Sequence, residues 1–378
     1  MAQSLNALAV GALVKDTGTL YNGKPIIWKI ADKGHTGYPS GAVTLITERI
    51  ISLKCFDAIE SGNSDGNRRS YGNNRWTLSN VRQWLNSQAA AGKWYSAQHG
   101  ADAPPTNANV WSNYNEYDTE AGFLSNFEAD FRKAILDAVI RVAKNTVTDG
   151  GGYEDITRKV FLLSNTEVGL SNENSVAEGA LWSYFSSAAR RQCYPTAEAV
   201  SNSEYTNSSL NASSYWYWWL RTPYAGIAYY ARNVYTDGSL YDYYACIGHY
   251  GVRPALYLES GNLVSDSTDT DGAYILQWNQ PPSDPSSISY GTPQAGNSLV
   301  LSTGGSTDPE GDAISYVWER KIDSGAYVQL GITTAKTFTD TVPTSGTTYT
   351  ARVKAVDANG LESVSYTHLR AHETELHL

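Results

Sequence analysis

Histidines most often carry acid–base and metal chemistry, so the six in this chain are examined first. His372 and His377 stand five residues apart, whereas the two histidines of a zinc-protease helix stand four apart, on one face. His35, His99 and His249 are isolated in the sequence, and no serine or cysteine nucleophile motif stands near any of them. This pattern predicts no catalytic machinery, and we expect a protein that is not an enzyme.

Cysteines and glycine-rich loops give no sign of redox or nucleotide chemistry. Cys55, Cys193 and Cys246 are too few for a disulfide framework and too far apart for a zinc site. The run Gly150 to Gly152 has no lysine beside it, and neither of the common glycine-rich phosphate-binding motifs occurs. We therefore predict free thiols and no cofactor.

Two groups of closely spaced carboxylates are the remaining candidates for metal binding, because calcium takes several oxygen ligands. The groups are Asp266, Asp269 and Asp271, and Asp308, Glu310 and Asp312. Neither has the twelve-residue register of an EF-hand. The sequence predicts solvated turns and no metal, with calcium at Asp308, Glu310 and Asp312 as the alternative.

One segment, Tyr215 to Leu256, has an unusual composition. It opens on Trp-Trp-Leu-Arg-Thr-Pro (218–223) and closes on Gly-Val-Arg-Pro-Ala-Leu (251–256). From Tyr224 to Tyr250 it holds eight tyrosines among small and polar residues, and no helical or strand period buries that many phenols on one side. Tyrosine mixed with small residues is typical of antibody contact loops. The segment therefore predicts a binding face.

The acidic composition narrows the class of partner. The chain of 378 residues has a net charge of −10, with 27 Tyr, 11 Trp and one Met. This balance argues against nucleic acid and anionic membrane surfaces. The first residues show no basic region followed by an apolar run, and no stretch approaches the roughly 20 apolar residues of a membrane span. We expect no signal peptide and no membrane insertion.

Hydrophobic patterning predicts both strands and helices around the tyrosine-rich segment. Strands are expected in residues 8–30, 42–55, 158–164 and 273–278. Three helices are expected: residues 76–86, residues 125–139 with a capping box of Ser125 and Glu128, and residues 176–190. Trp216, Trp218, Trp219, Leu220, Val252 and Leu256 are expected in the core, with Arg221 and Arg253 anchoring loops by hydrogen bonds.

Composition changes after residue 278 and predicts a second domain. The proline-rich segment 279–286 is typical of a linker. Residues 287–366 show short alternating strands, which predict a β-sandwich. These strands are expected at 299–301, 314–318, 327–330, 336–339 and 348–356. Residues 367–378 fit no strand pattern and resemble translated sequencing-adaptor read-through, so we predict a non-native tail after a first domain of residues 1–278.

Several motifs together strongly resemble the C-type-lectin-like variable proteins of diversity-generating retroelements, which occur in gut bacteria and their phages. They are Pro25-Ile-Ile-Trp, Trp76-Thr-Leu-Ser-Asn-Val-Arg-Gln-Trp-Leu-Asn, Val160-Phe-Leu-Leu-Ser, Trp218-Trp-Leu-Arg-Thr-Pro, Val234-Tyr-Thr-Asp-Gly-Ser and Gly251-Val-Arg-Pro-Ala-Leu. The resemblance covers about Leu8 to Leu258 and implies an α+β, C-type-lectin-like fold. The chain is also similar to the formylglycine-generating-enzyme fold, whose paired catalytic cysteines have no counterpart here.

The resemblance implies which residues contact a ligand. In that family, template adenines are mutated, so AAY codons change into codons for Tyr, Asn, Asp, Ser, Ala, Ile, Cys, His and Gly without creating stops. The implied variable positions are Tyr217, Tyr224, Gly226, Ile227, Tyr229, Tyr230, Arg232, Asn233, Tyr241, Tyr243, Tyr244, Cys246, Ile247, His249 and Tyr250. The alternative is a tyrosine-rich sheet surface that does not vary.

The second domain resembles fibronectin type III or bacterial immunoglobulin-like modules, through Tyr316-Val-Trp and residues 348–360. Phage tail and capsid proteins often bear such modules. The combined expectation is a non-catalytic phage tail or virion receptor-binding protein. Its partners are a host cell-surface protein or glycan and other virion proteins, and multivalent display favours a trimer. The alternatives are a bacterial surface or secreted ligand-binding protein, and an enzyme on a formylglycine-generating-type fold.

Overall fold

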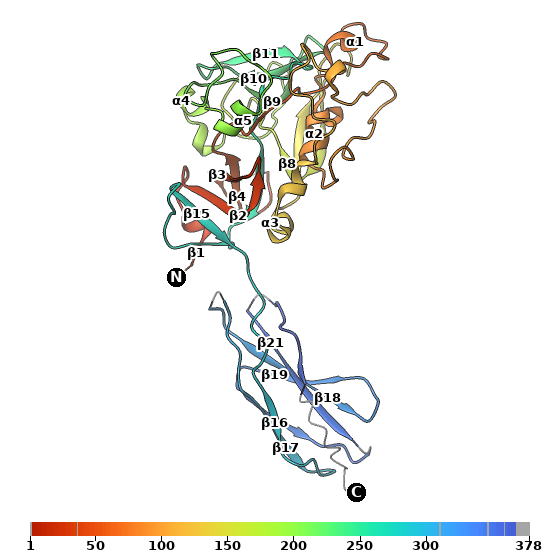
Figure 1. The fold of residues 1–378 in the computed structure, drawn as a ribbon, viewed down its shortest axis with the longest axis vertical. Coiled ribbons are helices and arrows are strands. Elements are labelled where there is room, and N and C mark those ends of the chain that lie inside the picture. Colours follow the sequence, from red (N-terminus) through yellow and green to blue (C-terminus); the bar gives the residue numbers. More distant parts are fainter. Residues whose placement is uncertain (1, 36, 310, 346–347, 359, 368–378) are drawn as a thin grey trace. The chain divides into compact units, whose positions relative to one another are not determined.

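The chain forms two compact units, Met1–Trp278 and Asn279–Leu378, called here the N-terminal and C-terminal units (Figure 1). The structure is a computed structural model and describes residues 2–35, 37–309, 311–345, 348–358 and 360–367. The division falls at the start of the proline-rich segment. Most of the tail expected to be non-native, residues 368–378, lies outside the described residues.

β-Strands build the N-terminal unit, and most of them belong to two sheets. The larger sheet has the order β1 (Gln3–Ser4), β14 (Leu263–Val264), β15 (Ala273–Gln277), β2 (Leu13–Tyr21), β3 (Lys24–Lys33), β4 (Ala42–Thr47), β13 (Ala255–Glu259), β8 (Val160–Phe161). The smaller sheet has the order β11 (Leu240–Tyr244), β10 (Tyr230–Val234), β9 (Trp218–Pro223), β12 (Gly251–Val252), β5 (Ser52–Leu53). A separate hairpin pairs β6 (Ala138–Ala143) with β7 (Tyr153–Arg158).

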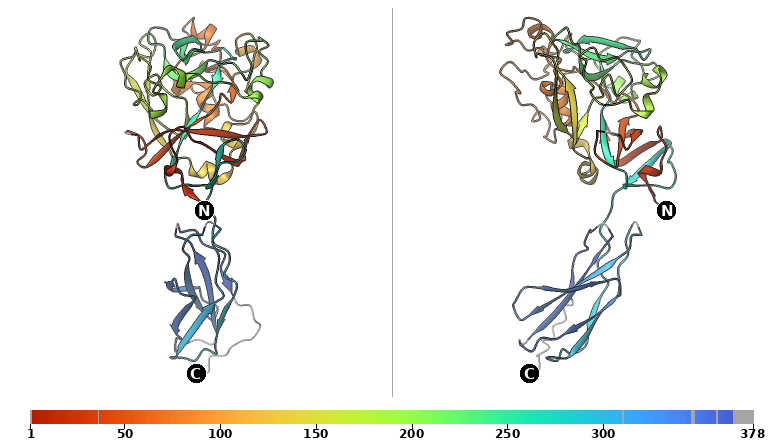
Figure 2. Two further views of the ribbon diagram at one scale, coloured as in Figure 1. Left: turned by 90° about the vertical axis from the view of Figure 1, so that its left-hand side faces the viewer. Right: turned by 180° about the vertical axis from the view of Figure 1, so that it is seen from behind.

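Helices are short throughout the described part of this unit. The α-helices are α1 (Arg68–Tyr71), α2 (Asn80–Leu85), α3 (Ala129–Ala134), α4 (Ala188–Arg191) and α5 (Ala197–Ser201). The 3₁₀ turns are η1 (Leu5–Ala7), η2 (Trp76–Leu78), η3 (Asn107–Asn109), η4 (Phe123–Asn126) and η5 (Ser183–Phe185). Figures 1 and 2 show β9, β10 and β11 at the end of this unit opposite to β1 and β15.

The expected α+β, C-type-lectin-like fold is wrong for this structure, which is mostly β. Strands make up 33% of the residues and helices only 11%. The longest α-helices, α2 and α3, have six residues each. The expected helix at 76–86 forms in part, as η2 followed by α2 with Ser79 as its N-cap.

The helix expected at 125–139 is also shorter than expected, and most of the helix expected at 176–190 does not form. Helix α3 ends at Ala134, since Ile135 bridges Leu258 and the Leu136 N–H donates to the carbonyl of Tyr257. The expected capping box does not form, because the Ser125 hydroxyl donates to the Gly122 carbonyl instead. Most of residues 176–190 forms a loop, in which Gly179 takes a φ of 106° that a helix does not permit.

The C-terminal unit is an immunoglobulin-like β-sandwich, and its expected strands are confirmed. One sheet has the order β16 (Ile288–Tyr290), β17 (Ser298–Thr303), β20 (Thr337–Thr341). The other has the order β19 (Val328–Thr333), β18 (Ser315–Ile322), β21 (Tyr349–Val356), β22 (Tyr366–Thr367). Trp318 is completely buried in the core between the two sheets, as a sandwich with alternating inward-facing residues requires.

Large aromatic residues fill the core of the N-terminal unit, as expected. The six predicted framework residues, Trp216, Trp218, Trp219, Leu220, Val252 and Leu256, are all buried. The indole N–H of Trp219 donates to the carbonyl of Lys54, and that of Trp218 donates to the carbonyl of Arg191. These bonds satisfy the polar atoms that burial takes away from water.

Arg221 of β9 is the centre of a buried ion network. Its guanidinium donates to both oxygens of Glu167, at 2.5 and 2.9 Å, and to the carbonyls of Leu162 and Glu178. Burial by itself lowers the pKa of Arg221, but the Glu167 carboxylate offsets this effect and the net shift is upward. Arg253 likewise donates to the carbonyl of Thr47, so the expected anchoring by both arginines is confirmed.

We predict that Arg221→Met lowers the free energy of unfolding by about 3–5 kcal/mol, because Glu167 is left buried without its partner. Urea unfolding of the full chain measures this change. The double variant Arg221→Met/Glu167→Leu is the control, and we expect a smaller loss because no buried charge remains. A single variant as stable as the native chain would contradict the role of the pair.

Candidate binding face

The tyrosine-rich segment is carried by three neighbouring strands of the smaller sheet, and β11 is the edge strand. Tyr230 lies opposite Tyr244, and Arg232 opposite Asp242, so these four side chains share one face. Tyr243, opposite Ala231, points to the other face. The tyrosines are therefore divided into two clusters, one on each face of the sheet edge.

The first cluster, called here the Tyr244 cluster, consists of Tyr71, Trp111, Tyr229, Tyr230 and Tyr244. The Tyr71 and Tyr244 rings stack with centroids 4.3 Å apart. The Trp111 ring lies 5.9 Å from both of them, and the Tyr229 ring lies 5.2 Å from Tyr71 and 6.0 Å from Tyr244. Trp111 is 41% exposed, an unusual position for so large an apolar side chain. The cluster presents aromatic surface to solvent at the edge of the sheet.

The backbone of Cys246 positions this cluster from within. Its N–H donates to the carbonyl of Tyr71, and its carbonyl accepts from the N–H of Trp111. The end of helix α1 at Tyr71 and the loop at Trp111, which both lie far upstream in the sequence, are thereby held beside β11. The Cys246 side chain itself is buried, and burial raises the pKa of its thiol to about 12.

The second cluster, called here the Tyr250 cluster, consists of Tyr205, Tyr217, Tyr235, Tyr241, Tyr243, His249 and Tyr250. Tyr250 is buried and contacts Tyr217 and Trp219 with centroids 4.2 and 4.4 Å away. His249 stacks on Tyr205 at 4.1 Å, and burial lowers the pKa of its imidazole to about 4. This imidazole is therefore neutral at neutral pH and packs as one more ring.

The fifteen expected contact residues do not have equal access to a ligand. Gly226 and Tyr241 are exposed, and nine are half-buried: Tyr217, Tyr224, Ile227, Tyr229, Tyr230, Arg232, Tyr243, Tyr244 and His249. Four are buried and cannot touch a ligand in this structure: Asn233, Cys246, Ile247 and Tyr250. Tyr71, Trp111 and Tyr205 belong to the clusters but were missed, and their only sequence signal was an aromatic residue within a polar loop.

The histidines and acidic groups have structural partners. His35 Nδ1 lies 2.5 Å from Asp32, and Lys15 Nζ lies 2.5 Å from both Asp269 and Asp271, where a metal ion would have to sit. Of the calcium candidates, Asp308 accepts from the Asp312 N–H, and Glu310 lies outside the described residues.

Glu60, His99 and Asp102 place their ligand-type atoms within 4.8 Å of one another. His99 Nε2 lies 2.7 Å from Glu60, while Nδ1 accepts from the Ala101 N–H. An imidazole that accepts through Nδ1 carries its proton on Nε2, which is then unable to bind a metal. With Nδ1 already accepting from the backbone, the geometry favours the contact of Nε2 with Glu60 over a metal site.

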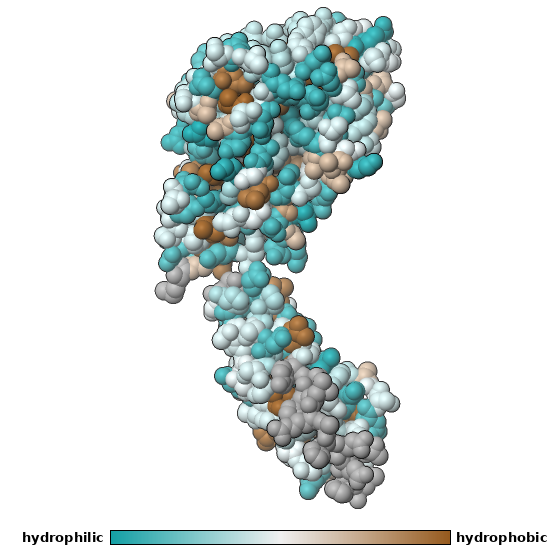
Figure 3. All heavy atoms as spheres, viewed as in Figure 1, coloured by the Kyte–Doolittle hydropathy of each residue, from teal (hydrophilic) through white to brown (hydrophobic). Residues whose placement is uncertain are grey.

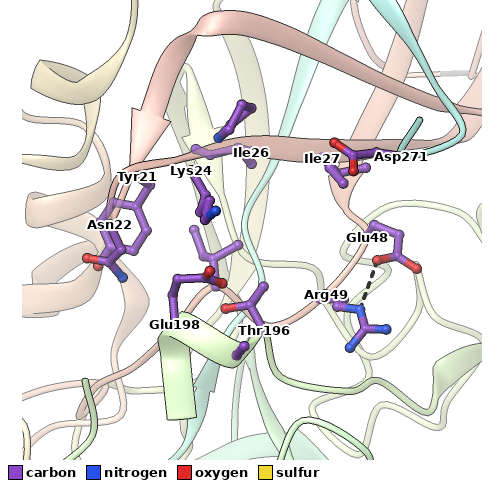
Figure 4. Close-up of a pocket in the computed structure, with 13 residues that line it drawn as sticks. Tyr21, Asn22, Lys24, Ile26, Ile27, Glu48, Arg49, Thr196, Glu198 and Asp271 are labelled. Carbon is purple, nitrogen blue, oxygen red and sulfur yellow. Dashed lines mark ion pairs between the residues drawn. The ribbon is translucent and has the colours of Figure 1, made fainter. Parts of the chain in front are cut away.

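A pocket of about 290 Å³ lies between the β2–β3 hairpin and helix α5 (Figure 4). Its lining mixes apolar residues such as Ile26 with charged ones, and Glu48 pairs with Arg49 at 3.3 Å.

In the view of Figure 3, hydrophobic residues on the surface form small separate patches. Within the described residues, no helix is long and apolar enough to span a bilayer.

Comparison with known proteins identifies the family. A family model described as "Domain of unknown function (DUF6273)" matches residues 41–260, more than half of the chain. The chain belongs to this family. The DUF6273 region includes both aromatic clusters. No curated protein matches the chain.

Solved structures show only partial similarity. The PKD domain of an M14-like peptidase from Thermoplasmatales archaeon SCGC AB-540-F20 is 25% identical, covering 26% of this chain and 97% of that one, with a TM-score of 0.19. An Fn3-like protein from Clostridium thermocellum is 29% identical, covering 23% and 92%, with a TM-score of 0.18. Similarity of this extent leaves the function of the DUF6273 region open.

The side chain of Asn233 is buried, and neither of its polar atoms has a hydrogen-bond partner among the described residues. Such a group is unfavourable by about 1–3 kcal/mol, so we expect Asn233→Ala to leave the free energy of unfolding unchanged or to raise it. Asn74→Ala is the matched control, because the Asn74 amide donates to the carbonyls of Tyr224, Ile227 and Tyr230 and its loss should be destabilising. Denaturant unfolding measures both variants. Equal losses would show that Asn233 has a partner.

Proposed function

We propose that the N-terminal unit is a non-catalytic binding module whose contact surface is the sheet edge carrying the Tyr244 cluster. The observation that carries the proposal is the compact group of the Tyr71, Trp111, Tyr229 and Tyr244 rings, half-buried or exposed at an edge strand. Aromatic rings of this kind give large contact area with few rotatable bonds to immobilise. Such rings are also the side chains most often found at the energetic centre of an interface.

The structure supports binding by separating contact residues from the core. All six residues of β9 are buried, whereas neighbouring β10 and β11 carry the half-buried and exposed side chains. Side chains on the outer strands therefore change without disturbing the strand that holds the sheet. A rigid scaffold of this sort is the usual carrier of a variable binding surface.

We further propose that this surface is diversified by a retroelement and belongs to a phage tail or virion protein that contacts a host surface. The residue types from Tyr224 to Tyr250 support diversification, because tyrosine there is interleaved with the small and polar residues that the family resemblance implies for mutated AAY codons. The C-terminal immunoglobulin-like unit suits a spacer between such a face and a larger assembly. A bacterial surface or secreted protein of the same design is the alternative.

Binding is tested with the full chain on a panel of bacterial cells and isolated surface glycans and proteins. We predict that Trp111→Ala weakens binding to any target found by about tenfold or more, because it removes the most exposed ring of the Tyr244 cluster. Tyr153→Ala is the matched control, since Tyr153 is also exposed, on the β6–β7 hairpin, outside both clusters. Equal binding by the two variants would contradict the proposed location of the surface.

Diversification is tested by sequencing the locus in many sibling genomes. We expect amino-acid differences to concentrate at the accessible positions, such as Tyr229, Tyr241 and Tyr244, and to be rare at framework positions such as Trp218. A nearby reverse transcriptase gene with a template repeat matching the codons from Trp216 to Gly251 is expected too. Silent differences, or none, at the tyrosines would remove diversification while leaving the binding proposal intact.

A further inference from the structure

Arg232, on the face of the sheet that carries the Tyr244 cluster, is held by three groups from three separate segments. Its guanidinium lies 2.6 Å from Glu173 and 2.9 Å from Asp242, and its central carbon lies 4.2 Å from the centre of the Tyr224 ring. The Arg232 side chain is only 11% exposed. Two carboxylates and an aromatic ring around a planar cation form a site with the chemistry that recognises arginine.

The walls of this site have supports of their own. The Glu173 carboxylate accepts from the backbone N–H of Ala225, and Asp242 belongs to β11, which pairs with β10 along its length. The centroids of the Tyr224 and Tyr230 rings lie 6.3 Å apart, and the backbone N–H of Tyr224 donates to the Tyr230 carbonyl. Removal of the Arg232 side chain therefore leaves two carboxyl groups and a ring in place, without the cation that lies between them.

We propose that Glu173, Asp242 and Tyr224 form a guanidinium-binding cage that Arg232 fills from within this chain. The cage accepts an arginine side chain of a partner protein when a shorter residue replaces Arg232. That a partner uses the cage rests on the proposed function, because residue 232 is one of the positions expected to vary. The cage itself is a property of this chain and does not depend on diversification.

Two other arginines in the chain provide a comparison. Arg141 lies 3.9 Å from the Tyr153 ring and pairs with one carboxylate, Asp155, but its side chain is 42% exposed. Arg352 lies 3.9 Å from the Tyr327 ring and pairs with Glu319. Arg141 and Arg352 each pair with one carboxylate, whereas Arg232 pairs with two. A more buried site with two carboxylates holds a guanidinium more tightly than an exposed site with one.

The test adds guanidinium chloride at low millimolar concentration to the full-length Arg232→Ala chain, with sodium chloride and ammonium chloride at equal ionic strength as references. Binding is followed by calorimetry and by the NMR signals of the Tyr224 ring. We expect guanidinium to bind Arg232→Ala about tenfold or more tightly than the native chain, whose cage is filled. We also expect guanidinium to bind Arg232→Ala about tenfold or more tightly than it binds Arg232→Ala/Asp242→Asn or Arg141→Ala. Arg232→Ala should bind guanidinium more tightly than ammonium, because guanidinium contacts both carboxylates at once.

The proposal is overturned if guanidinium binds Arg232→Ala no better than it binds Arg141→Ala, or no better than ammonium does. If Arg232→Ala does not fold, Arg232→Gln keeps most of the side-chain bulk while removing the charge, and the same comparison applies to it. If Arg232→Ala binds guanidinium but the native chain binds no target on the panel of cells, glycans and proteins, the cage is supported and the proposed function is contradicted. If the native chain binds a target but the variants do not bind guanidinium, the proposed function is supported and the cage is contradicted.

Discussion

The buried pair of Arg221 and Glu167 is the interaction on which the arrangement of the N-terminal unit depends. Arg221 stands in β9, and the carbonyls and carboxylate that surround it belong to the loops after β8 and to the hairpin strand β6. Each nitrogen of this fully buried guanidinium donates to a carbonyl or to Glu167, which matters because an unpaired charge in a protein interior is strongly unfavourable. Strand β9 can therefore occupy only one position against these loops.

A fixed β9 determines where the proposed binding surface can form. Strand β10 pairs with one side of β9, and β11 pairs with β10 as the free edge, so both outer strands inherit their position from Arg221 and its neighbours. The edge strand has one side without a strand partner, and its side chains meet solvent more readily than those of β9. Stability and contact chemistry are thereby assigned to neighbouring strands of the same sheet.

The two aromatic clusters differ in what they can do. In the Tyr250 cluster the central ring is buried and packs on Trp219, so part of its aromatic content is core. The Tyr244 cluster keeps its rings at the surface, and two loops are tied to it by the backbone of Cys246. A residue such as Cys246 thus shapes the surface through its peptide groups, although its side chain is out of reach of a ligand. Arg232 has a third role, since its charge neutralises two carboxylates that frame the same face.

The sequence by itself determined most of the strands, the buried framework around β9, the second β-domain and the segment that supplies most of the two aromatic clusters. These features follow from local alternation of apolar and polar residues and from composition, both of which are visible in a single chain. It did not determine where the helical patterns after Ser125 and Val176 are interrupted. Long-range pairing with β13 ends the first, and in the second the buried Glu178 carboxylate accepts a hydrogen bond from the Ala143 N–H. Only the tertiary structure decided which tyrosines face solvent, because strand register assigns each side chain to one face. It alone brought Tyr71 and Trp111 to Tyr244, since contacts between residues more than a hundred positions apart leave no mark on local sequence.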